Sequence, residues 1–319
     1  MTTPEERFRL LDTHSRYEGR QEALMSRRIP ASLLDLGASA PMYQPSAELE
    51  DAVNVALAVG SPLLLTGEPG TGKTQVAWYL GWYFGEDAKA TGAIPKNVYP
   101  LHVRSDTTAS DLLYTFDHIA YLRESQRGAD EVDKERFLSR GPLWQAFQAE
   151  GPAVVLIDEI DKAPRDFPND LLHVLDQHAF HVRELDRHIK RPEERPPPIV
   201  VITSNSERRL PEPFLRRCIF HHIPFDEDVV RRAVDARRAD YQALDEATLD
   251  LAIRRFLDLR EQYELRKKPA TAELLVWLAV LNAMGDVDAP KLDTPNISAM
   301  PALSALVKDR DDLDRLVGY

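Results

Sequence analysis

Cysteine is almost absent from this sequence. The 319 residues include a single cysteine, Cys218, so no disulfide can form within the chain, as is usual in a reducing compartment. No apolar run approaches the roughly 18 residues that a membrane-spanning helix needs. The first residues, MTTPEERFRLLDTHSRY, contain no apolar core of the kind found in secretory signals. We therefore expect no membrane span and a cytoplasmic location.

An excess of positive charge is also missing. The chain has 40 Lys and Arg against 52 Asp and Glu, which gives a net charge of −12. General nucleic-acid binders usually carry a basic surface, so this composition argues against nucleic acid as the partner. Nine histidines are present, but none has the H-E-x-x-H or paired Cys/His spacing of a zinc site. We expect no zinc.

The order of the sequence patterns predicts three parts. Residues 1–45 are polar and interrupted by prolines, which indicates an N-terminal extension with a short helix or two. Residues 46–225 alternate helical patterns with short apolar runs, a pattern typical of an α/β domain with a parallel sheet between helices. Residues 226–319 show helical patterns and predict a smaller all-α domain. The expected strands lie in SPLLLTG, VYPLHVR, GPAVVLIDE, PPPIVVITSN and RRCIFHHIPF.

A glycine-rich segment between the first strand and the next helix fits the pattern G-x-x-x-x-G-K-[ST]. It reads GEPGTGKT, and its place between strand and helix is the context that this motif requires. Glycines let backbone N–H groups close around phosphate oxygens, while a lysine reaches the outer phosphates and a hydroxyl can bind Mg²⁺. The segment therefore predicts a phosphate-binding loop made of Gly67, Glu68, Pro69, Gly70, Thr71, Gly72, Lys73 and Thr74.

Two carboxylates end the apolar strand VVLID. In open α/β sheets, the carboxyl ends of the strands border the ligand crevice. Asp158 is placed there to hold Mg²⁺, and Glu159 to polarise an attacking water. The alternative is a solvated acidic loop, since Asp161 and Lys162 follow.

Two further segments carry candidate site residues. The strand VITSN ends in Asn205, whose amide could bond to a phosphate or to the water, or could instead cap a helix. The segment EPFLRRC holds Arg216 and Arg217. Two adjacent arginines need partners, and these could be acidic residues of the same chain, such as Glu207 or Glu212, or a group in another chain.

This combination of motifs resembles the AAA+ ATPases, and more closely their MoxR branch. RSDTTASDLLYTFD is similar to that branch's insert in the second helix. SRGPLWQAF is similar to its segment before the strand that ends in the acidic pair. LDQHAFHVRELDRHIKRPEERPPP is similar to its hairpin before the strand that ends in asparagine. The resemblance covers about residues 43–285. It implies a parallel P-loop sheet flanked by helices and followed by a small all-α lid.

The resemblance also implies an activity: hydrolysis of ATP with Mg²⁺ to remodel or activate a protein partner. Lys73 and Thr74 match the Walker A motif, Asp158 and Glu159 match Walker B, and Asn205 matches sensor 1. Arg217, or else Arg216, matches the finger that reaches a neighbouring subunit, which implies a ring, usually a hexamer. The partner in this branch is often a von Willebrand A domain protein.

One departure from the branch concerns the arginine that usually follows Ser-Pro in the lid. Here LRKKPATAELL places Ala270 after Pro269, so Lys268 or Arg266 is the candidate for this contact.

Two rival functions stay open, a nucleic-acid motor and a nucleotide-dependent scaffold. Arg183, Arg187 and Lys190 of the expected hairpin would contact a client if the hairpin faces a pore, and would be solvated if it is only a loop.

Overall fold

The structure is a computed structural model that describes residues 30, 33, 35–85, 93–127, 132–285, 287, 289–294 and 297–317. The helices expected in residues 1–45 lie largely outside the described residues. Within the described part of residues 1–45, the structure shows the 3-10 helix η1 (Ala40–Met42). The described chain forms two compact units. The sheet unit contains residues 45–67 and 72–223, and the helical unit contains residues 224–319, residues 68–71 and the described residues up to Gln44.

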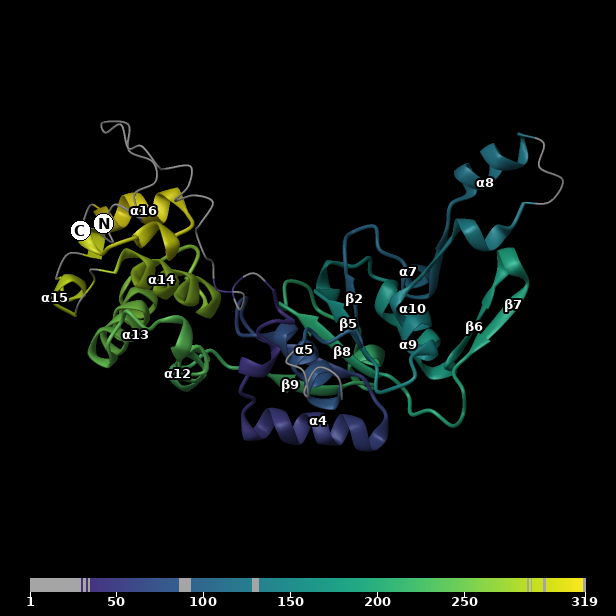
Figure 1. Cartoon of the computed structure of the whole chain (residues 1–319), viewed down its shortest axis with the longest axis horizontal. Helices are drawn as coiled ribbons and strands as arrows, with labels where there is room; N and C mark the ends of the chain where they lie inside the picture. Colours follow the sequence, from purple (N-terminus) through teal and green to yellow (C-terminus); the bar gives the residue numbers. More distant parts are fainter. Residues whose placement is uncertain are drawn as a thin grey trace. The chain divides into compact units, whose positions relative to one another are not determined.

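A parallel sheet of five strands is the centre of the sheet unit (Figure 1). All four neighbouring pairs are parallel, which confirms the expected α/β fold. Buried apolar side chains fill the central strands on both faces, as a sheet covered by helices on each side requires. In the order β2-β5-β8-β1-β9, the strands are Val98–His102, Val154–Asp158, Ile199–Ser204, Leu63–Thr66 and Ile219–His222.

The helices of the sheet unit begin and end where local chemistry dictates. The Ser46 hydroxyl accepts a bond from the Leu49 N–H at the start of α4, and Gly60 ends that helix in the left-handed region. Side chains on one face of the sheet, such as Leu64 and Ile157, pack with α9 and α10 into a single buried cluster. The helices are α4 (Ala47–Val59), α5 (Lys73–Phe84), α7 (Ala109–Leu113), α9 (Pro142–Gln148), α10 (Phe167–Gln177), α11 (Glu212–Leu215) and the 3-10 helix η3 (Ile160–Lys162).

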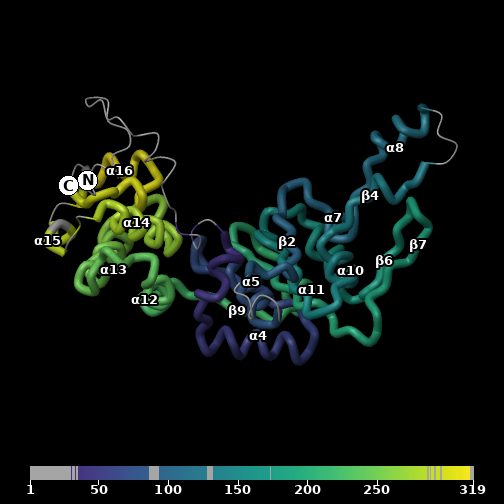
Figure 2. The backbone as a smooth tube through the Cα atoms, viewed as in Figure 1, coloured from purple at the N-terminus to yellow at the C-terminus, as the bar shows by residue number. Residues whose placement is uncertain are grey.

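Two excursions of the sheet unit lie side by side and point away from the sheet (Figures 1 and 2). The expected hairpin is present, and it contacts an insert that begins within the expected residues 104–117 but continues to Arg140. Arg187 donates to Glu135 at 2.6 Å, and the Phe180 ring stacks on Tyr114. Neither segment is therefore an isolated loop. The insert consists of β3 (Tyr114–Phe116), α8 (His118–Ser125), η2 (Lys134–Phe137) and β4 (Leu138–Arg140), and the hairpin of β6 (Ala179–Val182), η4 (Arg183–Leu185) and β7 (Arg187–Lys190).

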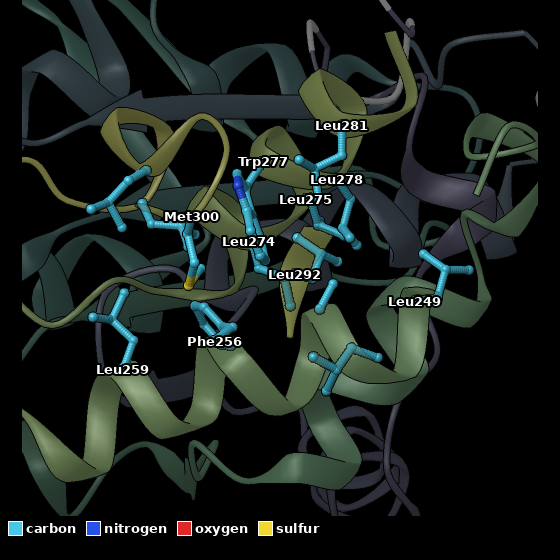
Figure 3. Packing of buried hydrophobic residues seen from close by; sticks show 14 of the residues in the cluster. Leu249, Phe256, Leu259, Leu274, Leu275, Trp277, Leu278, Leu281, Leu292 and Met300 are labelled. Carbon is cyan, nitrogen blue, oxygen red and sulfur yellow. The ribbon is translucent and has the colours of Figure 1, made fainter. Parts of the chain in front are cut away.

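The helical unit has its own apolar core, to which α13 contributes Phe256 and α14 contributes Leu274 and Trp277 (Figure 3). The Trp277 indole donates to the Pro301 carbonyl at 2.8 Å, so this buried ring has its polar atom satisfied. No described helix is long and apolar enough to cross a membrane. The elements of this unit are α12 (Glu227–Asp235), η5 (Arg238–Asp240), α13 (Glu246–Gln262), α14 (Thr271–Met284), α15 (Ala289–Leu292), η6 (Ile297–Ala299), η7 (Leu303–Ala305) and α16 (Arg310–Val317).

Candidate functional site

The three polar motifs of the sheet unit meet at one edge of the sheet. Because β1, β5 and β8 run parallel, their carboxyl ends lie together, and Thr66 of β1 is in register with Ser204 of β8. The glycine-rich segment follows β1, Glu159 follows β5 and Asn205 follows β8. This edge is where open α/β sheets bind their ligands.

The glycine-rich segment has the backbone that only glycine adopts easily. Gly67, Gly70 and Gly72 have φ angles of 151°, 78° and 90°. Gly72 is the residue before α5, so the loop opens directly into the N-terminus of a helix, where N–H groups and the helix dipole favour anions. The Lys73 side chain is buried, and its ammonium donates to the Gly67 carbonyl at 2.9 Å. The lysine ammonium thus lies inside the loop.

The Asp158 carboxylate accepts hydrogen bonds from hydroxyl groups of two motifs. Its Oδ1 accepts a bond from Thr74 at 2.8 Å and a second from Thr203 at 2.7 Å. Its Oδ2 lies 3.3 Å from Nδ1 of His102, the last residue of β2. The predicted metal residues Thr74 and Asp158 are therefore brought together, with a buried threonine behind them.

Glu159 has a left-handed backbone, with φ of 61°, a conformation rare for residues other than glycine. Its N–H donates to the Thr203 hydroxyl at 2.9 Å, which helps to hold this conformation. Oε1 accepts from the Asn205 amide at 3.2 Å, and Oε2 accepts from Lys162 at 2.6 Å. This hydrogen bond to Glu159 raises the pKa of Lys162. Asp161 is buried, and Glu159 and Asp161 both have specific partners, which argues against the alternative of a solvated acidic loop.

Asn205 lies near Glu159 and does not cap a helix. The next helix, α11, begins seven residues later and has Pro211 at its N-cap position. Strand β8 ends at Ser204, so Asn205 is the first residue past the sheet edge and its amide points at the carboxylate. The helix-cap alternative for Asn205 is therefore wrong.

Arg216 and Arg217 lie at the other edge of the sheet, just before β9 begins. Arg217 lies 3.2 Å from Asp176, and Arg216 lies 3.8 Å from Glu212, with more than half of each of these side chains exposed. Glu212 is one of the two acidic residues named as possible partners within the chain, and Asp176 is a partner that the sequence did not indicate. A cavity of about 750 Å³ borders both arginines.

In the helical unit, the lysine and arginine expected to act from the lid have different surroundings. Arg266 contacts Asp311 through its guanidinium and donates its backbone N–H to Asp312 at 2.9 Å. Lys268 is exposed. A third basic residue, Arg260 of α13, is buried and donates to Glu68 of the glycine-rich segment at 2.6 Å.

Sequence reasoning missed three residues beside these motifs. His102 could have been found, because it ends the strand that pairs with the Asp158 strand. Asp161 follows the acidic pair too closely to be distinguished from a solvated charge. Arg260 is a charged residue on the apolar face of a helix, which is a visible signal, but its partner Glu68 lies 192 positions away in the sequence.

Comparison with known proteins identifies the class of the sheet unit. Residues 62–218 match the family model of the AAA domain (dynein-related subfamily). No curated protein matches the chain. Among solved structures, the chain is similar to a Cytophaga hutchinsonii protein provisionally assigned as an ATPase, with 14% identity, 79% of each chain covered and a TM-score of 0.40. The family match, the parallel sheet and the P-loop together define the sheet unit as an AAA domain, a nucleotide-binding fold.

Proposed function

We propose that this protein hydrolyses ATP to ADP and phosphate, and that it uses the reaction to remodel or activate a protein partner in the manner of the MoxR branch. The observation that carries the proposal is the connected network at one sheet edge. Thr74 bonds to Asp158, Asp158 bonds to Thr203, and Glu159 bonds to Asn205. An AAA domain with an intact network of this kind has the groups that both binding and hydrolysis require.

The donor atoms fit a magnesium ion that accompanies the nucleotide. Mg²⁺ prefers oxygen ligands and is usually held by one or two protein groups together with phosphate oxygens and water. The Thr74 hydroxyl and the Asp158 carboxylate lie 2.8 Å apart, and both are oxygen donors. We propose that these two residues hold Mg²⁺, which neutralises negative charge on the phosphates when it is bound.

The other residues at this edge have separable roles. The N–H groups of residues 67–74 surround the phosphates, and Lys73 turns its ammonium from the Gly67 carbonyl to the outer phosphate oxygens. Glu159 orients the attacking water and accepts its proton. The Asn205 amide holds the carboxylate of Glu159 in place. Lys162 occupies the second oxygen of Glu159, so it must share or release that oxygen when water binds.

A further charge is expected from a second copy of the chain. Because β9 is parallel to β1 and the arginines precede it, Arg217 lies at the edge of the sheet opposite to the P-loop of its own chain. We propose Arg217, with Arg216 as the alternative, as the finger that stabilises the transferred phosphoryl group in a neighbouring subunit of a ring, which in this branch is usually a hexamer.

The helical unit is proposed as a lid, with boundaries at residues 226–319 beside an AAA domain of residues 46–225. Of the two basic residues expected to contact nucleotide from the lid, we keep Lys268 as the first candidate and Arg266, whose guanidinium contacts the exposed Asp311, as the second. A von Willebrand A domain protein as client and a cytoplasmic location are proposals that rest on the resemblance alone.

A nucleic-acid motor is less well supported than a protein remodeller. The basic residues that would contact nucleic acid lie on the hairpin, and two of them have acidic partners in the chain. Arg187 bonds to Glu135 at 2.6 Å, and Lys190 bonds to Glu193. An ATPase rate that rises on addition of DNA or RNA would reverse this preference.

The function is tested most directly by Glu159→Gln. The amide has nearly the same shape but cannot accept a proton, so the variant should bind ATP and lose about 10²–10⁴-fold in turnover. Turnover is measured by phosphate release and binding by calorimetry. Glu150→Gln is the matched control, since Glu150 is an exposed residue that precedes β5, at the far edge of the sheet.

The same variant serves to find the client. A stalled ATP state should retain its protein partner in a pulldown, and the parent chain should release it. A parent chain without ATPase activity, or a Glu159→Gln variant that hydrolyses at the parent rate, would overturn the proposed mechanism.

A further inference from the structure

Asp161 is a buried carboxylate to which no role has been assigned. It lies in η3, two residues after Glu159, and only 2% of its surface is exposed. A carboxylate removed from water is costly unless hydrogen bonds or a counter-charge replace its hydration. The bonds that Asp161 makes therefore indicate what it is there to hold.

Both oxygens of Asp161 bind backbone N–H groups of the segment that follows β8. Oδ1 accepts from Asn205 at 3.2 Å, and Oδ2 accepts from Glu207 at 3.0 Å. Between them, Ser206 has a left-handed backbone with φ of 60°. Neighbouring N–H groups around a left-handed residue form a concavity that attracts anions. Here the anion is a carboxylate from the same chain, and bonds to a charged acceptor are stronger than neutral ones.

This arrangement connects Asp161 to the candidate base. The segment it fixes begins with Asn205, whose amide donates to Glu159 at 3.2 Å. We propose that Asp161 is a positioning residue for ATP hydrolysis: it fixes the backbone of Asn205 and, through the Asn205 side chain, the direction of the Glu159 carboxylate. The proposal rests on the proposed function and adds a residue to it.

Asp161 does not itself touch the phosphate-binding loop or the two candidate magnesium ligands in the bonds that the structure describes for it. Its removal should therefore affect the chemical step and leave nucleotide binding intact. A purely structural carboxylate would lower stability without this separation between kcat and KM.

The test uses Asp161→Asn and Asp161→Ala in the full chain, with kcat, KM, ATP affinity and the unfolding midpoint measured for each. Asparagine keeps the shape but loses the charge, and alanine removes both acceptors. We expect kcat to fall about tenfold for Asn and up to about a hundredfold for Ala, in line with the loss of one or two bonds to a charged group. KM and ATP affinity should change by less than about twofold.

A control and a double-mutant cycle separate positioning from folding. Asp245 also binds a backbone N–H, that of Thr248 at 2.8 Å, but at the start of α13 in the helical unit. Asp245→Ala should lower the unfolding midpoint and leave kcat at the parent value. In an Asn205→Ala background, Asp161→Asn should cost little further activity, because both changes break the same connection to Glu159.

Three results would overturn the proposal. The first is a parent-like kcat in Asp161→Asn and Asp161→Ala. The second is a loss that is as large in the Asn205→Ala background as in the parent, which would mean that Asp161 does not act through Asn205. The third is failure of both variants to fold, which would make the carboxylate a requirement of the fold.

If the parent chain itself hydrolyses no ATP, the proposed function fails and the positioning role falls with it. If the parent is active and Glu159→Gln is not, the function stands and Asp161 is judged alone.

Discussion

The two edges of the central sheet differ in how far their polar groups are satisfied by the chain itself. At the carboxyl edge, Thr74, Asp158, Thr203, Glu159 and Asn205 bond to one another over distances of 2.7–3.2 Å. At the amino edge, the described partners of Arg216 and Arg217 are exposed acidic side chains at 3.8 and 3.2 Å. The polar groups at the carboxyl edge are therefore held by hydrogen bonds within the chain, whereas the two arginines at the amino edge make exposed ion pairs.

This difference supports the proposal that the catalytic centre is assembled from two subunits, with the carboxyl edge of one and Arg217 of the other. A preorganised network costs no reorganisation when the reaction occurs, which suits groups that act on their own nucleotide. Exposed ion pairs contribute only about 0–1 kcal/mol, so Arg217 can leave Asp176 for a more negative partner at little cost. A phosphate group in another subunit would be such a partner.

The largest effect is expected for Arg217→Ala. A finger supplied in trans is worth about 10³–10⁵ in rate, so the variant should bind ATP normally and hydrolyse it poorly. Lys73→Ala subunits, which keep Arg217 but lose the lysine of the P-loop, should restore hydrolysis when they are mixed with Arg217→Ala subunits. Native mass spectrometry verifies that mixed rings form. Mixed rings without recovered activity would show that Arg217 does not act between subunits.

A smaller effect is expected at the carboxyl edge for Thr203→Val. The substitution keeps the shape but leaves the Glu159 N–H without its acceptor and Asp158 without one of its donors. An unsatisfied buried group costs about 1–3 kcal/mol, so stability should fall by that amount and kcat by about 10- to 100-fold. Denaturant unfolding and steady-state kinetics measure the two effects.

Thr248→Val is the matched control for Thr203→Val. Both threonines are 1% exposed, but Thr248 lies in α13 and bonds to the Asp245 side chain. The Thr248→Val variant should therefore be less stable than the parent chain but hydrolyse ATP at the parent rate. Equal losses of kcat in the two variants would contradict the special role of the hydroxyl at the sheet edge.

The smallest effect is expected for Asp176→Ala, which removes the exposed partner of Arg217. Stability should change by no more than about 1 kcal/mol, and ATP turnover should stay near the parent rate, since Arg217 remains available to a neighbouring subunit. Thermal unfolding at low and high salt and a phosphate-release assay are sufficient. A loss of turnover as large as that of Arg217→Ala would instead mean that the pair acts within its own chain.

Local sequence patterns were sufficient to predict most of the fold. The segment TAELLVWLAVLNAM predicts the helix observed at Thr271–Met284, and the buried apolar run before Asp158 predicts β5. Both are decided by short-range properties, namely helical spacing of apolar residues and a continuous apolar run. The phosphate-binding loop is predictable for the same reason, since its glycines and Lys73 are contiguous in the chain.

The contacts of Asp161 and Arg260 could not be predicted in this way. Asp161 binds residues 44 and 46 positions further along, and Arg260 binds Glu68 at a separation of 192 positions. Nothing in the residues next to them indicates these partners. The pairing of Arg217 with Asp176 could not be predicted for the same reason, because Asp176 lies on a helix that approaches Arg217 only in the folded chain.

The sequence by itself determined the class of fold and the residue types of the site, because the periodicity of apolar residues and the contiguous P-loop depend on neighbours in the chain. Tertiary structure decided which side chains bond to one another and which edge of the sheet each occupies. The parallel pairing of β1, β5 and β8 brings Lys73, Asp158 and Asn205 to one edge, and the parallel pairing of β9 with β1 puts Arg217 at the other. Strand direction and order are set by packing over the whole domain, so no local pattern contains them.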